Sequence, residues 1–395
     1  MKGHSMDEIR TLKAQMKSLL ENLIRAKKAM AAARINPRLL DAVEHRFEWK
    51  ARESKEQLEA LEKKIDIGKS IEECWKEFGA LRKSLDEHFR ECLAFLGGAL
   101  IRSEGLDSRL CVVADAILWK LSHNVDCEWT RFTIMADVDL FADMSEIIRL
   151  RFPEFSIWHL PIVAHELGHF VADKLDRDAR LFAGLMEKED LGACSVSTLH
   201  EQFADVFAVN ALGPAYACSC IFLEFDPTRI YEGGSGHPPD YERVHLIIRS
   251  LKTIDEKNQR GDYAPSIDAL NSLWHCSMKA CKKQGSLTSE HAARLDNRLD
   301  RIFGHKGVGS RLKNIRYNNE PRYDRWPQAS LLSTQLELQT VEDIFNVPGR
   351  KFILRDVLNA AWQWRLWHPG ENYGPVGQKA LDLCLKMIES GKFEV

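Results

Sequence analysis

The first 68 residues carry a regular spacing of apolar positions. From Ile9 to Ala33 these positions recur every three or four residues, which is the heptad pattern of a helix that packs against another helix. The members of this seam are Ile9, Leu12, Met16, Leu19, Leu23, Ala26, Met30 and Ala33. After Asn36-Pro37, a looser stripe follows at Leu40, Val43, Phe47, Leu58, Leu61 and Ile65. The pattern predicts an antiparallel coiled-coil hairpin over residues 1–68, which either packs on the rest of the chain or joins a second copy or a partner protein.

Most of the remaining chain also has helical spacing of its apolar residues. Helices are predicted for residues 70–122, 267–282, 287–303 and 357–367. The last of these is rich in aromatic residues and is followed by His368-Pro369-Gly370, so we expect a buried helix that ends there. Its residues Trp362, Trp364 and Trp367 either pack in the core or line a pocket.

One region has the pattern of strands instead. Trp129–Ile134 and Ile147–Phe152 are rich in β-branched and aromatic residues, and Pro153 ends the second run. Arginines alternate with apolar residues along the second run, which predicts a strand with one positively charged face. The acidic segment 136–146 predicts a loop. Residues 304–327, rich in Gly, Asn, Arg and Tyr, predict a long loop or lid.

Composition narrows the class of protein. A chain of 395 residues, 45% of them apolar, can hold two or three domains with sizeable cores. The formal net charge of −3 gives no positive excess for binding nucleic acid. Ten scattered cysteines favour reduced thiols in the cytoplasm. We expect no membrane span and no signal peptide, because no apolar run is long enough and the N-terminus leads directly into a charged helix.

The pentapeptide His165-Glu166-Leu167-Gly168-His169 carries the most specific chemistry in the chain. Histidines four residues apart on a helix project from one face, so both can bind one metal ion. H-E-x-x-H is the arrangement of zinc metalloproteases, in which the intervening glutamate is the general base and not a ligand. The alternative is a buried amphipathic helix whose histidines are hydrogen-bonded core residues.

A third metal ligand is expected from the segment Glu201-Gln202-Phe203-Ala204-Asp205. Catalytic zinc takes three protein ligands and leaves one position for water. Glu201 and Asp205 share a helix face, so Glu201 can bind the metal while Asp205 orients a ligand histidine. The alternative is that Thr198 and Glu201 form a capping box at the start of a helix.

A third segment, His237-Pro238-Pro239-Asp240-Tyr241-Glu242-Arg243, follows a glycine-rich run and leads into a helix. The paired prolines are typical of a loop that enters a helix. A functional interpretation is that His237 or Tyr241 stabilises the oxyanion. Arg243 is expected to pair with Asp205 and hold it beside the metal ligands.

In this order, H-E-L-G-H, E-x-x-A-D and H-P-P-x-x-x-R resemble the motifs of the gluzincin metallopeptidases, which include the CAAX prenyl proteases and bacterial membrane-quality-control proteases. The resemblance covers roughly residues 147–250 and is strongest at the motifs. It implies one zinc ion per chain, bound by His165, His169 and Glu201, with Glu166 as general base.

The same resemblance makes His237 and Arg243 active-site candidates and implies an extended peptide substrate that pairs with a strand near residues 147–152. Many members of that family are embedded in a membrane. Since this chain is expected to have no membrane span, the CAAX substrate does not carry over.

The expected fold is therefore mainly α (α+β), in three parts. These are the hairpin at 1–68, a zincin-like metallopeptidase core with a small sheet at 69–305, and a loop plus C-terminal helical region at 306–395 that packs on the core. The expected function is zinc-dependent hydrolysis of an intracellular protein, either constitutive or held latent by the hairpin or the 304–327 loop. The alternative is a coiled-coil scaffold whose metal site is structural or silent.

Overall fold

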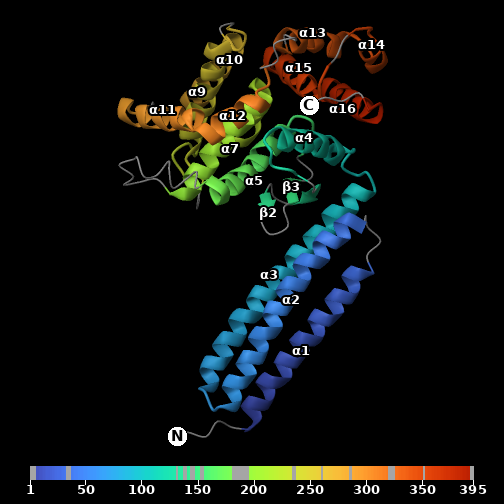
Figure 1. Ribbon diagram of the computed structural model, residues 1–395, viewed down its shortest axis with the longest axis vertical. Helices are drawn as coiled ribbons and strands as arrows, with labels where there is room; N and C mark the ends of the chain where they lie inside the picture. The colour runs from blue at the N-terminus through green and yellow to red at the C-terminus, as the bar shows by residue number, and fades with distance from the viewer. Residues whose placement is uncertain are drawn as a thin grey trace. The chain divides into compact units, whose positions relative to one another are not determined.

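The computed structural model consists mainly of α-helices, with one small sheet (Figure 1). The described residues are 6–32, 37–129, 132–136, 140–142, 147–151, 155–179, 195–233, 237–258, 261–283, 287–318, 325–349 and 352–391. Contacts divide the chain into two units, Met1–Ser108 with Ile134–Phe152 and Arg109–Thr133 with Pro153–Val395. The mainly helical fold class expected from the sequence is confirmed.

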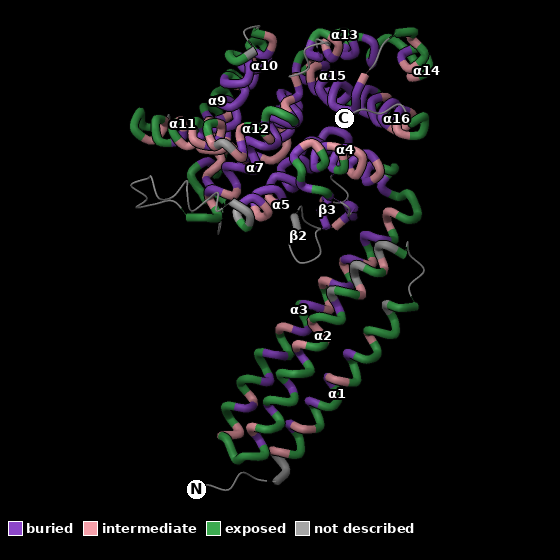
Figure 2. Tube along the Cα trace, in the orientation of Figure 1, coloured by how far each residue is buried: buried purple, intermediate pink, exposed green. Residues whose placement is uncertain are grey.

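The first unit contains the predicted hairpin. Its helices are α1 (Met6–Ala31) and α2 (Pro37–Asp66), and they are antiparallel, because Lys13 of α1 pairs with Asp66 at 2.7 Å and Lys27 pairs with Glu48 at 2.5 Å. The seam positions Leu12, Met16, Leu19 and Leu23 are buried inside this unit. Figure 2 shows the resulting alternation of buried and exposed positions along both helices.

This unit differs from the expected hairpin because a third helix belongs to it. Helix α3 (Ile71–Ser103) packs against both α1 and α2. Phe47 of α2 stacks on His88 of α3 with ring centroids 5.6 Å apart, and Lys64 pairs with Glu77 at 2.8 Å. The division therefore falls after Ser108 and not at residue 68, and α1 and α2 have an intrachain partner for their apolar faces.

A three-stranded sheet also belongs largely to this unit. Its strands are β1 (Thr133–Ala136), β2 (Leu140–Ala142) and β3 (Ile147–Arg151), in the order β1-β3-β2, and β2 pairs with β3 antiparallel. Gly98 of α3 lies so close to β1 that a Cβ there would overlap the carbonyl oxygen of Met135. The absence of a side chain at Gly98 therefore lets the helix and the strand meet.

Three expectations about this region need correction. The first strand begins at Thr133 and not at Trp129, whose apolar character instead reflects burial in an irregular segment. Strand β2 lies inside the segment 136–146 that was predicted to be a loop. Arg149 does not form an exposed positive face, because it is buried, pairs with Glu91 at 2.6 Å and lies over the ring of Phe95.

The second unit consists mainly of helices joined by turns and loops. Its elements are α4 (Leu110–Asn124), α5 (Ile162–Ala179), α7 (Val196–Leu212), α8 (Pro214–Ser219), the π-helix η1 (Cys220–Glu224), α9 (Asp240–Asn258), α10 (Ala264–Ala280), α11 (Ser289–Gly304), α12 (Lys306–Ile315), α13 (Arg325–Leu338), α14 (Val341–Phe345), α15 (Leu354–Trp367) and α16 (Gly374–Glu389). Helix α7 is central, with every residue from Glu201 to Leu212 buried, and it contacts α5, α8, α9, α12 and α15. Among the described residues, no helix is long and apolar enough to cross a membrane.

The C-terminal part also differs from expectation. Residues 304–327 were predicted to be a loop or lid, but they contain α12 and the start of α13. One of their glycines has a packing role, because a Cβ at Gly309 would overlap the carbonyl oxygen of Phe303. Residues from 306 onward belong to the same unit as the helices before them. The predicted buried helix is confirmed as α15, in which Trp362 and Trp364 are buried and Trp367 is 49% exposed.

The C-terminal end of α7 is held by residues distant in sequence. A helix leaves its last four carbonyl groups without intrahelical partners. Here Gly213 donates to the carbonyl of Val209 at 2.8 Å, and the other three accept from Tyr317, Arg355 and Asn359, each at 2.9 Å. Asn359 also accepts from the backbone N–H of Ala215 at 3.0 Å, so this one side chain of α15 fixes the turn between α7 and α8.

Candidate metal centre

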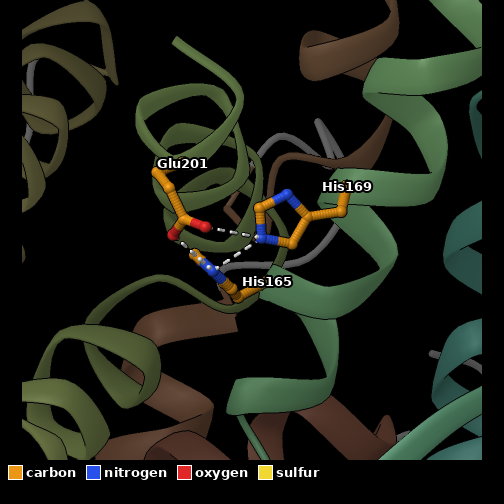
Figure 3. Close-up of side chains that lie close together, drawn as sticks. All are labelled: His165, His169 and Glu201. Atoms are coloured by element: carbon orange, nitrogen blue, oxygen red, sulfur yellow. Dashed lines mark hydrogen bonds and ion pairs between the residues drawn. The ribbon is translucent and has the colours of Figure 1, made fainter. Parts of the chain in front are cut away.

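Three side chains from α5 and α7 converge on one point (Figure 3). The Nε2 atoms of His165 and His169 are 3.1 Å apart. The two carboxylate oxygens of Glu201 lie 3.4 Å from these nitrogens, Oε2 from His165 and Oε1 from His169. Among the described residues, this is the group of His, Cys, Asp or Glu side chains close enough to hold a metal ion.

The distances fit a tetrahedral zinc ion. Zinc binds imidazole nitrogen and carboxylate oxygen at about 2.0–2.2 Å, so two ligand atoms of a tetrahedral site lie about 3.4 Å apart. The three observed separations, 3.1, 3.4 and 3.4 Å, are close to that value. Two imidazoles and one carboxylate are also the donor set of many catalytic zinc sites.

Close packing of the two helices brings the ligands together. A Cβ at Gly168 would lie 2.8 Å from the Cα of Ala204, so the backbones of α5 and α7 touch between the ligands. Any side chain at position 168 would separate the helices. Gly168 thus contributes to the site by its lack of a side chain.

The capping interpretation of Glu201 is not supported by the start of α7. The N-cap is Ser195, whose hydroxyl accepts from the N–H of Thr198 at 3.1 Å. Glu201 lies in the second turn of α7 and is only 6% exposed. A buried carboxylate requires a counter-charge, which agrees better with a ligand than with a solvated helix face.

Behind the ligands, Asp205 is fully buried and joins α7 to three other helices, α5, α8 and α9. It accepts two hydrogen bonds from Arg243 of α9, at 2.7 and 2.9 Å, as expected from the sequence. The Nδ1 atom of His165 lies 3.0 Å from Asp205 Oδ1 and from the hydroxyl of Tyr216. A proton held on Nδ1 by these oxygens leaves Nε2 with its lone pair directed at the metal position.

Tyr216, on α8, was not identified from the sequence. Its hydroxyl donates to Asp205 at 2.5 Å and touches His165, and burial raises its pKa well above 10, so it stays a neutral donor. No motif marks it, because its role depends on the direction of α8 after Gly213. The feature of the sequence that could have drawn attention to Tyr216 is that it is a single tyrosine in a run of small residues just beyond α7.

The buried carboxylates of the cluster favour a positive charge between them. Burial alone would raise the pKa of Glu201 and Asp205, but the facing histidines and Arg243 hold both pKa values well below the ordinary range. Burial would likewise lower the pKa of His165, yet its bonds to Asp205 and Glu201 raise it to about 10. Burial and the neighbouring His165 lower the pKa of His169 to about 3. Without metal, a single proton on His165 therefore supplies positive charge between two carboxylates.

Of the predicted catalytic residues, Glu166 and His237 adjoin the ligand group, Glu166 in sequence and His237 through a contact with Glu201. Glu166 is buried between the two ligand histidines on α5 and is not a member of the ligand group. His237, with a side chain 62% exposed, has its Nδ1 atom 3.2 Å from Glu201 Oε2, and this contact raises the pKa of the imidazole.

Tyr241 is not brought to the ligands. Its ring packs against Tyr231 and His291, and its hydroxyl donates to Glu242 at 3.4 Å. Residues two apart on a helix point in nearly opposite directions, so Tyr241 faces away from the side on which Arg243 meets Asp205. Of the two oxyanion candidates, only His237 lies at the site.

Comparison with known proteins finds no matching family model, no matching curated protein and no matching solved structure.

Proposed function

We propose that this protein is a zinc-dependent peptidase of the gluzincin type, which hydrolyses peptide bonds of a protein substrate at the centre formed by His165, His169 and Glu201. The observation that carries the proposal is the convergence of these three donors at zinc-like separations, with Glu166 held on the same helix turn. Zinc bound there would act as a Lewis acid and would lower the pKa of a water molecule towards about 7.

The side chains have separable roles in this proposal. Glu166 accepts a proton from the attacking water and later delivers it to the nitrogen of the leaving amine. His237 lies in contact with Glu201 Oε2 and is largely exposed, so it can donate a hydrogen bond to the oxyanion. Asp205, Arg243 and Tyr216 hold His165 in the orientation and tautomer that a ligand needs.

The mode of substrate binding requires a change from the first expectation. An extended peptide cannot add to β3, because β3 lies between β1 and β2 and its backbone groups are paired on both sides. We propose an extended peptide as the substrate and assign no strand to its binding.

A scaffold with a structural metal is the competing function. A structural zinc site is closed by four protein ligands, whereas three donors form the group found among the described residues. A structural site also needs no general base, yet a buried glutamate, Glu166, directly follows the first of the two histidines in sequence.

The deciding experiment combines metal content with hydrolysis. The purified protein should contain about one zinc per chain, and His165→Ala/His169→Ala should lose it. Glu166→Gln should keep the zinc and the fold but lose most cleavage of an unfolded protein substrate. Zinc retained in the double histidine variant would refute the ligand assignment. Equal cleavage by Glu166→Gln and the parent would refute the catalytic one.

A further inference from the structure

The guanidinium of Arg365, on α15, is surrounded by aromatic rings. Its central carbon lies 4.0 Å from the ring centroid of Tyr373, 4.9 Å from Trp362, 5.0 Å from Trp158 and 5.8 Å from Phe222. All four distances are within the range of cation–π attraction. The rings come from the turn before α5, from η1, from α15 itself and from the residue that precedes α16.

The ring cluster is preformed. Trp158 meets Trp362 edge to face at 5.4 Å and Tyr373 at 5.9 Å. The carbonyl of Trp158 accepts hydrogen bonds from Ser219 at 3.0 Å and from the Trp362 indole at 3.1 Å. A Cβ at Gly377 would lie 2.9 Å from the Trp158 indole nitrogen, so α16 is packed directly against this ring. These contacts hold the rings in place around the cation.

Arg365 has no anionic partner among the described residues. In the same unit, Arg243 pairs with Asp205 at 2.7 Å and Arg325 with Asp356 at 3.4 Å. The interactions of Arg365 are instead with ring faces, and burial without a carboxylate lowers its pKa. The charge is therefore stabilised by the surrounding rings, and no carboxylate among the described residues pairs with its N–H groups.

The N–H edge of the guanidinium is open to a ligand. Arg365 is part-exposed, and none of its nitrogens is among the buried polar atoms without a partner. The adjoining first turn of α16 contains no acidic residue, and the ring of Tyr373 beside it is 45% exposed. A planar guanidinium presents its donors in a fork that matches the two oxygens of a carboxylate.

We propose that Arg365 and its aromatic cage bind a carboxylate carried on an apolar or aromatic body. The carboxylate accepts two hydrogen bonds from the N–H edge, and the body of the ligand packs on the exposed part of Tyr373. The rings keep the fork in one orientation, so little side-chain entropy is lost on binding. This site lies outside the metal centre and does not depend on the proposed peptidase activity.

The test uses the full-length protein with benzoate as the probe and benzamide as its neutral isostere. Binding is followed through the indole N–H signals of Trp158 and Trp362 in NMR spectra, in both zinc-loaded and zinc-free protein. Benzoate should bind about 10-fold or more tightly than benzamide, because the bonds to an anion are lost in the amide. Equal shifts with both compounds, or none with benzoate, would overturn the proposal without any variant.

Variants then assign the binding to the guanidinium. Arg365→Lys keeps the positive charge but loses the planar fork, and should weaken benzoate about 10-fold or more. The matched control Arg109→Lys, at an exposed arginine paired with Glu389 in the same unit, should leave it unchanged. Undiminished binding by a folded Arg365→Lys would contradict the assignment. N-acetylphenylalanine and N-acetylglutamate amide, each tested in the same way, distinguish a chain-terminal carboxylate from an acidic side chain as the natural source.

Discussion

Replacement of Gly168 by alanine tests whether the contact between α5 and α7 sets the metal geometry. The added Cβ would lie 2.8 Å from the Cα of Ala204, whereas ordinary contacts begin at 3.4 Å. The helices must therefore separate by about 0.6 Å, since backbone atoms on both sides cannot rotate away. The same displacement would move Glu201 from 3.4 Å to about 4 Å from the histidine nitrogens, beyond the separation that a tetrahedral zinc allows.

Two quantities should change together in Gly168→Ala. Overpacking costs about 1–3 kcal/mol, and the better helix propensity of alanine offsets about 0.5–1 kcal/mol of that, so stability should fall by up to about 2.5 kcal/mol. Zinc affinity should fall about 10- to 100-fold, as for other losses of ligand support. Urea unfolding with a chelator present gives the first value, and competition with a chromophoric chelator gives the second.

Gly79→Ala is the matched control for this variant. Gly79 lies inside α3, and an added Cβ there meets nothing within 4 Å. Its replacement should stabilise the protein by about 0.5–1 kcal/mol and leave zinc affinity unchanged. If Gly168→Ala binds zinc as tightly as the parent, the helix contact does not set the ligand positions, and the reasoning fails.

Further predictions concern catalysis, pH and the support of α7. Glu166→Gln should retain zinc and lower kcat about 10²- to 10⁴-fold, measured beside zinc content. His237→Ala should retain zinc and lower kcat about 10²- to 10³-fold, while Tyr241→Phe should match the parent; the reverse result would exchange their roles. In metal-free protein the raised pKa of His165 contributes stability below pH 6.5 that is lost as the pH rises through about 10. Urea unfolding across that range should show this loss with a chelator and not with zinc bound. Asn359→Leu leaves the carbonyl of Leu212 and the N–H of Ala215 without this partner, so the free energy of unfolding should fall by about 1–3 kcal/mol for each group. Zinc binding should weaken as well. An unchanged free energy of unfolding would show that the turn does not need this side chain.

Much of the candidate site could be predicted because its residues lie on helices at fixed spacing. The period of a helix places His165 and His169 on one face and Glu201 beside Asp205. Tyr216 could not be predicted in this way, since the turn at Gly213 determines where its hydroxyl points. Tyr241 is a different case, because its two-residue spacing from Arg243 on a helix already places the two side chains in nearly opposite directions, and the expectation for Tyr241 overlooked this.

The fold was predicted less completely, for physical reasons that differ by region. Apolar periodicity identifies α3 as a helix but not its partners, so its membership in the first unit was missed. The segment containing α12 has the glycines typical of a loop, but Gly309 is needed for close packing inside a helical region. Strand β2 has three residues, which is too short for alternation of side chains to be recognised.

The support of α7 by α15 has a consequence for biosynthesis. All three metal-ligand candidates precede Asp205 in the sequence. Asn359, whose side chain donates to the last carbonyl of α7, is synthesised 154 residues after Asp205 (359 − 205). At about 5–20 residues per second, a ribosome needs roughly 8–30 s to cover that distance. During this interval the nascent chain contains the ligands without the helix that holds α7 and α8 in register. We therefore expect a chain arrested before residue 354 to bind zinc weakly, so that the metal is acquired only when translation is nearly complete.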